Sequence, residues 1–214
     1  MIDNRQEMNN EEQYIAHYNL KEQAIENLLG PSAGVVGHAM IPFRVLAGIT
    51  IGQVDMHYFP NHIEGTGFTT MKLINPDGTG PKPNKKGTYE LVAFTKLPFN
   101  DINQDPPTAF NLMERRMCDN FTQIAAAAQE KVFNPFEICG IKGGDGKTRY
   151  IIFDVYKTFE IEGHKHHLLL CMEIFEEELA TVENFGHKGF LEMLKMIKIY
   201  PYSDLDRNWV GIKK

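Results

Sequence analysis

Histidines are the residues of this chain that most clearly suggest chemistry. His164 and His166 are separated by one residue, so on an extended strand both side chains point the same way and can approach one metal ion. A metal site also needs a third and a fourth ligand. The nearest carboxylate, Glu173, is expected on the opposite face of the same strand. We therefore favour exposed turn histidines, and a metal-dependent hydrolase at His164 and His166 remains an alternative.

A second pair of histidines, His57 and His62, flanks Pro60, and Asp55 shares the expected face of His57. An acid beside a histidine can support general-base catalysis. However, the sequence has no Gly-x-Ser-x-Gly elbow and no His-Glu-x-x-His motif to complete such a site. We favour a polar sheet surface, with a hydrolase at His57 and His62 as the alternative. The prediction is that the protein is not an enzyme and has no catalytic residues, cofactor or metal.

The segment 143–148 ends in Gly-Lys-Thr, as a phosphate-binding loop does. Such a loop must begin a helix, because the helix amino terminus directs backbone N–H groups at the phosphate. The residues that follow, 149–156, have the composition of a strand. We therefore predict a hairpin turn and no nucleotide binding.

The densest acidic group follows the last predicted strand, within 173–178. Carboxylates in the first turn of a helix interact favourably with its dipole, which is a structural explanation for them. An exposed acidic group can also recognise a basic partner. The candidate partner-binding residues are Glu173, Glu176, Glu177, Glu178, Asp55 and His57.

The periodicity of the sequence predicts the elements that position these residues. Helices are expected at 11–29, 108–131, 176–184 and 188–198. Strands are expected at 50–59, 68–74, 89–95, 149–156 and 166–175. Because strands are grouped, the fold class is α+β, with a mixed, largely antiparallel sheet flanked by helices. One domain is expected over 11–200, between a flexible amino terminus, 1–10, and a tail, 201–214.

Bulk properties exclude several classes of protein. The net charge is −6 and no basic block is longer than Lys85-Lys86, which argues against nucleic-acid binding. No apolar run approaches the roughly 20 residues that span a bilayer, and the first residues lack a secretion signal. Cys118, Cys139 and Cys171 form no close pair, so we predict buried, reduced thiols and a cytoplasmic protein without a membrane partner.

Several segments resemble the suppressor of fused domain family. They are the helix ending at 28–30, the strand 54–60, the runs 68–71 and 89–91, and the closing run 168–179, where a strand passes through a polar turn into a helix. Together they span about residues 11–200. The sequence departs from the family at 72–75, which replaces a small-residue motif, and at Phe99, where the family has tryptophan.

The resemblance implies a divergent, bacterial-type, single-domain member of this suppressor of fused-like family. It implies a protein-binding domain without catalytic residues. Single-domain bacterial members resemble immunity proteins, which neutralise toxins, so the implied partner is a protein, for example a basic toxin encoded nearby. An intracellular scaffold or adaptor is a further alternative. The oligomeric state and the identity of the partner are not predicted.

Overall fold

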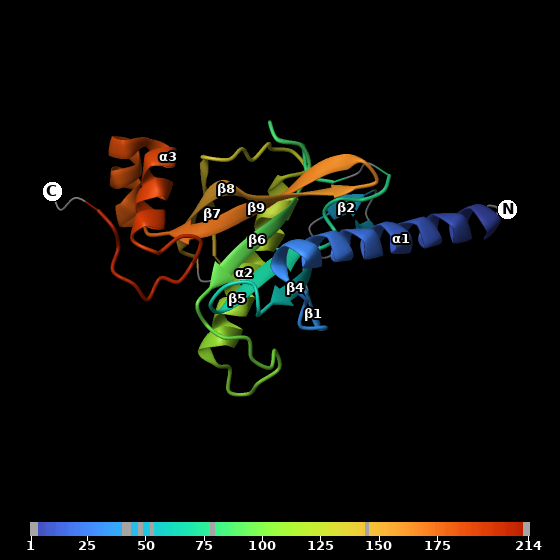
Figure 1. Ribbon diagram of the computed structural model, residues 1–214, viewed down its shortest axis with the longest axis horizontal. Coiled ribbons are helices and arrows are strands. Elements are labelled where there is room, and N and C mark those ends of the chain that lie inside the picture. The colour runs from blue at the N-terminus through green and yellow to red at the C-terminus, as the bar shows by residue number, and fades with distance from the viewer. Residues whose placement is uncertain are drawn as a thin grey trace.

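The computed structural model describes residues 4–39, 44–46, 49–51, 54–77, 80–143 and 146–211, with only the backbone described at 4–10, 44–46 and 49–51. Three α-helices and nine strands lie in these segments (Figure 1). The helices are α1 (Asn4–Leu29), α2 (Ala109–Ala127) and α3 (Leu179–Met196), the last preceded by a 3-10 turn, η1 (Glu176–Glu178). The strands are β1 (Val36–His38), β2 (Arg44–Leu46), β3 (Ile49–Ile51), β4 (Asp55–Phe59), β5 (Thr66–Thr70), β6 (Tyr89–Thr95), β7 (Ile138–Lys142), β8 (Thr148–Ile161) and β9 (His164–Ile174).

Seven of these strands form one sheet in the order β1-β4-β5-β6-β9-β8-β7. Only β6 and β9 pair in parallel, and the other neighbours are antiparallel. β2 and β3 form a separate hairpin. The predicted fold class, α+β with a mixed and largely antiparallel sheet, is therefore confirmed.

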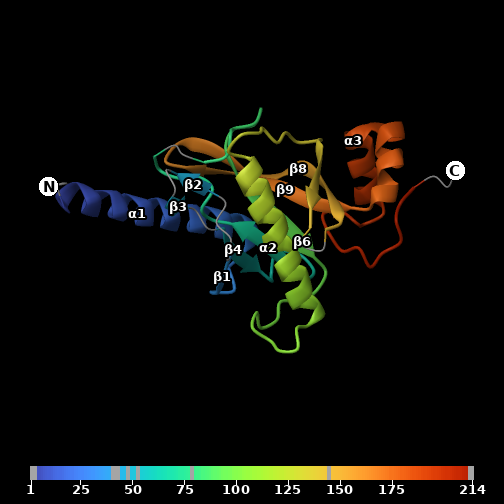
Figure 2. The same ribbon diagram turned by 180° about the vertical axis from the view of Figure 1, so that it is seen from behind.

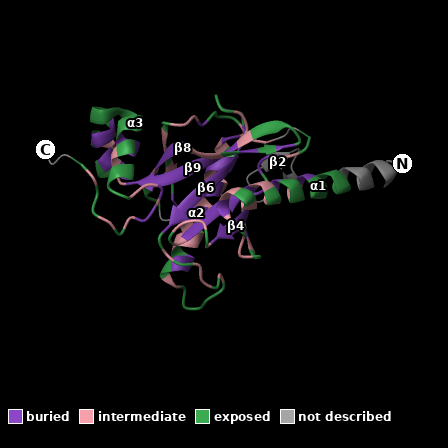
Figure 3. Ribbon diagram, viewed as in Figure 1, coloured by how far each residue is buried: buried purple, intermediate pink, exposed green. Residues whose placement is uncertain are grey.

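Helices pack on both faces of the sheet. α2 crosses one face, which we call the α2 face, and α1 and α3 pack on the other, which we call the α1 face (Figures 1 and 2). Side chains of β6 alternate between them, with Leu91 and Ala93 in the core under α2, and Val92 and Phe94 in the core under α1. The central strands are accordingly buried on both sides, and exposed residues gather on the helices and loops (Figure 3).

The helix α1 begins earlier than its sequence predicts. The helix was expected to begin at residue 11, after Asn10, but it continues back to Asn4 and projects beyond the sheet (Figure 1). Asparagine is only mildly unfavourable within a helix, so it need not stop one. The other end is as predicted: Gly30 has φ 83°, and its N–H donates to the carbonyl of Glu26.

Three of the predicted strands are wrong in their bounds. The strand predicted at 149–156 is β8, which continues to Ile161. The run 50–59 contributes to two strands, β3 and β4, which lie in different sheets. The run 68–74 ends as a strand at Thr70, because the N–H groups of Leu73 and Ile74 donate to the Glu90 carboxylate instead of to a neighbouring strand. β6 has the predicted bounds, and β7, a short strand containing glycine, was not predicted.

The remaining helices lie where the sequence predicts them, but α2 ends at Ala127 instead of residue 131. Thr108 caps α2 through its hydroxyl, as its position before the amphipathic run favours. The two short helices expected near the carboxyl end form α3, which is broken at Gly186, with φ 70° and ψ 159°. No helix among the described residues is both long and apolar enough to cross a membrane.

Candidate functional site

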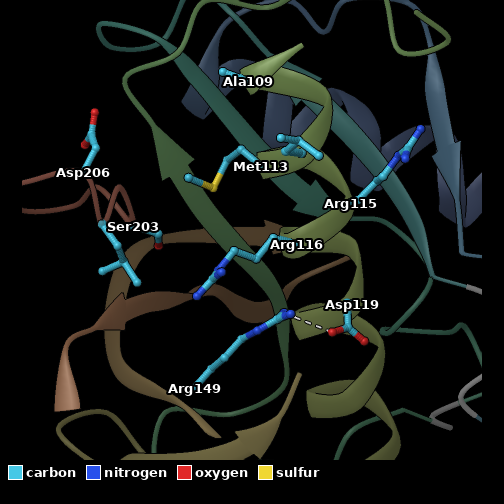
Figure 4. A pocket seen from close by; sticks show the side chains of 10 residues that line it. Ala109, Met113, Arg115, Arg116, Asp119, Arg149, Ser203 and Asp206 are labelled. Atoms are coloured by element: carbon cyan, nitrogen blue, oxygen red, sulfur yellow. Dashed lines mark hydrogen bonds and ion pairs between the residues drawn. The ribbon is translucent and has the colours of Figure 1, made fainter. Parts of the chain in front are cut away.

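A groove of about 640 Å³ opens between α2 and the chain that follows α3 (Figure 4). Its lining combines apolar side chains of α2 with charged side chains from three parts of the chain. The lining residues are Ala109, Leu112, Met113, Arg115, Arg116, Asp119, Arg149, Ser203, Leu205 and Asp206. Such a mixture of apolar walls and a few polar groups is typical of binding sites.

The carboxyl-terminal segment forms one wall of this groove because it joins the ends of β6 and β9. Tyr202 forms a parallel bridge with Phe94, and the Ser203 hydroxyl accepts the N–H of Glu173 at 3.1 Å. The groove therefore lies beyond the carboxyl ends of the one parallel strand pair. In open α/β sheets ligands bind in crevices at the carboxyl ends of parallel strands.

Glu173, a predicted partner-binding residue, lies inside the protein beneath this groove. It is 1% exposed, and its carboxylate accepts a hydrogen bond from Nε of Arg116 at 2.7 Å. The second guanidinium nitrogen of Arg116 bonds the other carboxylate oxygen, and Asn120 donates at 3.3 Å. A bidentate pair of this kind fixes the guanidinium plane. Glu173 is thus an internal anchor for Arg116.

Arg149 on β8 is held from the other side of the groove through one nitrogen. Its Nη1 donates to Asp119 at 3.0 Å (Figure 4). The same nitrogen donates to the side-chain oxygen of Asn120 at 2.9 Å. The side chains of Arg116 and Arg149 extend into the same space between α2 and the sheet (Figure 4). The groove can therefore offer two oriented guanidinium groups to a polar or acidic ligand.

The other three glutamates of the predicted acidic group divide into two classes. Glu178 is 0% exposed and binds Arg207 at 2.9 Å and the N–H of Val210 at 2.8 Å. It therefore fastens the carboxyl-terminal segment to the start of α3. Glu176 and Glu177 are exposed. In place of one exposed group of four, the structure has two accessible carboxylates and two buried ones.

Asp55 and His57 are also buried, at 4% and 3% exposure. Asp55 lies 2.7 Å from the ammonium of Lys72, in the loop after β5, and 2.8 Å from Nδ1 of His38 on β1, so its negative charge is balanced within the fold. His57 bonds the hydroxyl of Tyr18 on α1 at 2.6 Å. Burial lowers the pKa of His57, which therefore stays neutral near pH 7. Both residues join elements of the fold to one another.

The two histidine pairs considered for metal binding have different surroundings. His62 bonds the Tyr156 hydroxyl at 2.6 Å and does not share the partners of His57. His164 and His166 both line a second, smaller pocket on the α1 face, as their spacing on one strand predicts. Among the described residues, no three or more His, Cys, Asp or Glu side chains are arranged to hold a metal ion.

The Gly-Lys-Thr segment precedes a strand, as predicted. Gly143 donates its N–H to the Lys147 carbonyl at 2.8 Å, and β8 begins at Thr148. No helix amino terminus is therefore available to a phosphate at this position.

One edge of the sheet is formed by β7. The hydrogen bonds from Gly143 to Lys147 and from Phe153 to Glu137 set which residues face β8. Because backbone groups alternate along an antiparallel strand, the N–H and C=O of Ile138, Gly140 and Lys142 point away from the sheet. Gly140 and Lys142 are exposed. A partner strand can therefore reach these groups.

Sequence reasoning missed several residues that the structure brings together. His17 and Lys21 are buried between α1 and the sheet, and Arg116 and Arg149 face one groove. A signal for the first two does exist. The buried residues of α1 recur every fourth position, and two of the four are polar. They are His17, Lys21, Ile25 and Leu29. The arginines have no such signal, because their partners are distant in sequence.

Comparison with known proteins adds information about the fold. No protein-family model matches the sequence, and no curated protein matches it either. Among solved structures, a chain of the Sufu-Fu complex crystal structure is similar, with a TM-score of 0.52 and 12% sequence identity. The match covers 86% of this chain and 84% of that one. The two chains share a fold. At this identity the likeness shows only the fold, and it agrees with the family resemblance found in the sequence.

Proposed function

We propose that this protein is a non-enzymatic protein-binding domain that receives an extended segment of its partner on the β7 edge. The observation that carries the proposal is the set of outward backbone groups at Ile138, Gly140 and Lys142, on a strand with no further strand beside it among the described residues. Adding a strand to a free sheet edge is a common way to bind a peptide. The fold supports the proposal, since the similar solved chain comes from a complex between two proteins.

Two neighbouring features suit this edge to a protein partner. Tyr150 lies opposite Gly140 in the ladder, and its hydroxyl is 3.4 Å from the carboxylate of Glu176. The exposed pair Glu176 and Glu177 is therefore close to the edge, where it would attract a basic partner. On the α2 face, Arg149 lies opposite Ile141 and lines the groove. A bound strand would have polar anchors on both of its sides.

We further propose that the partner is a toxin and that this domain acts as its immunity protein. The proposal rests on the family resemblance and on the exposed acidic pair, which suits a basic toxin. Co-expression with the product of the adjacent gene tests it. We expect that product to be toxic alone, to co-purify with this protein, and to lose its toxicity in the complex. A neighbour that is harmless and does not co-purify would contradict the immunity role.

A matched pair of variants at Lys142 tests the edge itself. Lys142→Pro removes the outward N–H and adds a ring there, while leaving the bonds to β8 at Ile141 in place. Lys142→Ala removes the same side chain and its 3.0 Å bond to Thr148, but keeps the N–H. With the co-purified partner, we expect proline to weaken binding by about tenfold or more and alanine by less than about threefold.

Equal losses in the two Lys142 variants would show that the side chain is recognised, and unchanged binding in both would exclude this edge. The acidic pair is tested by replacing Glu176 and Glu177 together with lysine, with Glu183→Lys on exposed α3 as control. We expect the double variant to slow association and to reduce its salt dependence, and the control to do neither. If association is unchanged, the acidic pair has no part in the contact.

A further inference from the structure

A pocket of about 290 Å³ lies on the α1 face. It borders Ile161 at the end of β8, whereas β7 pairs with the beginning of that strand, at residues 148–152. The pocket is enclosed by α1, by the loop after β5, by the residue before β6 and by the β8–β9 hairpin. The polar lining comes from His17, Asn75, Thr88, Glu162, His164 and His166, and the apolar lining includes Pro76 and Pro81. Neither the groove beside α2 nor the β7 edge involves these residues.

The inner wall of this pocket is His17, which is buried and lacks hydrogen-bond partners. It is 8% exposed, and neither Nδ1 nor Nε2 has a hydrogen bond among the described residues. Nearly all buried polar groups in proteins are hydrogen-bonded, so a buried imidazole with two unused nitrogens needs an explanation. Its position in the pocket lining provides one: a ligand in the pocket can bond to it.

The mouth of the pocket carries a carboxylate. Glu162 lies in the turn between β8 and β9, with its side chain 64% exposed and one oxygen 3.8 Å from Nδ1 of His17. Glu162 has φ 51° and Gly163 has φ 81°, the pair of positive values typical of a tight hairpin turn. The turn therefore holds this acid at the entrance.

His166 supplies a third polar group, and its orientation is fixed. Its Nδ1 is 2.6 Å from the Thr88 hydroxyl, which leaves Nε2 on the other side of the ring. When Nδ1 carries the proton, Nε2 is an acceptor. His17, His166 and Glu162 thus come from three separate elements and can each accept a hydrogen bond.

We propose that this pocket binds a guanidinium group, either on a free arginine-like molecule or on an arginine side chain of another protein. Guanidinium has five N–H donors in a plane and no acceptor, which matches a carboxylate and two neutral imidazoles placed around one cavity. The prolines offer flat apolar walls for the stem of the side chain. A metal ion fits less well, because the described donors are not arranged around one point.

The charges around the histidines agree with a cationic ligand. Burial lowers the pKa of His17, and Lys21 lowers it further, while Glu162, the backbone of Ile74 and Glu90 oppose this; the Ile74 contact falls outside ordinary hydrogen-bond geometry. Burial also lowers the pKa of His166, followed by His17, His164 and Lys21, with Glu90 opposing. Both imidazoles are therefore neutral near pH 7 and keep a lone pair for a donor. Acid would protonate them, and the imidazolium would repel a guanidinium.

Binding is tested with N-acetyl-arginine amide and its neutral analogue N-acetyl-citrulline amide, by NMR on the full isotope-labelled chain. At about pH 7.5 we expect saturable shifts at His17, Glu162 and His166 with arginine, and affinity for citrulline lower by about tenfold. An arginine-containing peptide that binds more tightly than the free amide would identify a protein as the source, and equal affinities a small molecule. The arginine affinity should fall as the pH is lowered and these histidines gain protons.

Two variants and one control complete the test. Glu162→Gln should weaken arginine binding by about threefold to fivefold, since an exposed charge contributes modestly. The control is Glu160→Gln. Glu160 is an exposed carboxylate on β8 next to Ile161, which lines the pocket, so its side chain points to the opposite face and the change should have no effect. His17→Leu should abolish binding and raise the melting temperature, because it removes buried groups without partners.

The proposal is overturned if arginine gives no saturable shifts, if citrulline binds equally well, or if the two glutamine variants behave alike. It is also overturned if one zinc ion per chain binds at these histidines and arginine does not. The test is independent of the proposed partner at β7, because it uses a small probe and a different face of the sheet.

Discussion

Two polar residues one helical turn apart on α1, His17 and Lys21, are both buried against the sheet, but only Lys21 makes its hydrogen bonds within the fold. The ammonium of Lys21 donates to the Ile74 carbonyl at 2.6 Å and to the Glu90 carboxylate at 2.7 Å. His17 has no hydrogen bond to any described residue. Burial of a polar group is costly unless its bonds are made within the fold.

The Glu90 carboxylate that pairs with Lys21 accepts several further hydrogen bonds. Besides Lys21, it accepts the Thr70 hydroxyl at 2.6 Å and the N–H groups of Leu73 and Ile74 at 3.1 and 3.0 Å. This single side chain therefore joins α1, β5, β6 and the loop after β5. Lys21 therefore stabilises the fold through bonds made within it, whereas the hydrogen-bonding capacity of His17 is not used by the fold.

Breaking the matched pair should have the largest effect. Lys21→Met leaves a buried carboxylate that still has three donors, and we expect a loss of about 3 kcal/mol of unfolding free energy. Glu90→Leu leaves the buried ammonium of Lys21 with a single carbonyl acceptor and leaves the N–H groups of Leu73 and Ile74 without an acceptor. We therefore expect a loss of about 5 kcal/mol of unfolding free energy. Urea denaturation of both variants measures these values.

The double variant, Lys21→Met with Glu90→Leu, sharpens this result. It restores apolar contact between α1 and β6, so its loss should be smaller than the sum of the single losses. It should not reach the stability of the unmodified protein, because Thr70, Leu73 and Ile74 lose their acceptor. Losses that simply add would mean that Lys21 and Glu90 do not act as a pair.

The sequence predicts the parts of this fold that depend on local patterns. The apolar stripe of α2 and the strand 89–95 follow from periodicity, because both faces of β6 and one face of α2 are buried. The ends of α1 and β5 do not follow. The end of β5 is set by Glu90, which is 17 residues from Leu73 in the chain and takes its N–H group.

The candidate sites were only partly predictable for the same reason. His164 and His166 were singled out from their spacing, and they do line one pocket. Their neighbour His17 comes from an element more than 140 residues earlier, so no local motif connects them. Glu173 and Glu178 were expected on the surface with Glu176 and Glu177. Their burial depends on Arg116 and Arg207, two arginines that only the tertiary structure brings to them.

Acid should expose a further difference between buried histidines. His167 on the α2 face accepts one bond, from the Asn84 amide at 3.2 Å, and burial followed by His166 and Lys86 lowers its pKa to about 4. The unfolded value is about 6.5, so between these values the unfolded chain binds a proton that the folded chain does not. Stability is therefore complete above about pH 6.5 and falls as the pH drops toward about 4, by up to about 3 kcal/mol from this residue.

Urea unfolding across this pH range tests the prediction. His167→Leu should flatten the dependence, because the proton-binding difference disappears. His187→Gln, at an exposed position in α3, serves as a control that should leave the slope unchanged. A slope that persists in His167→Leu would assign the acid sensitivity to other buried groups, of which His17 and His57 are the first to test.

The smallest effect on stability is expected from the contact between His17 and Glu162. Glu162 is the carboxylate beside His17, as Glu90 is the carboxylate beside Lys21. Glu162, however, lies 3.8 Å from its partner and is largely exposed, so solvent screens most of its charge. Glu162→Gln should therefore change the unfolding free energy by less than about 0.5 kcal/mol. It should nevertheless lower the pKa of His17 further, because Glu162 is the first of the groups that raise it. An NMR titration of the His17 ring measures this directly, with Glu160→Gln as the control. A pKa of His17 that stays constant would mean that Glu162 does not act on His17 in solution. Glu162 would then not be part of the pocket.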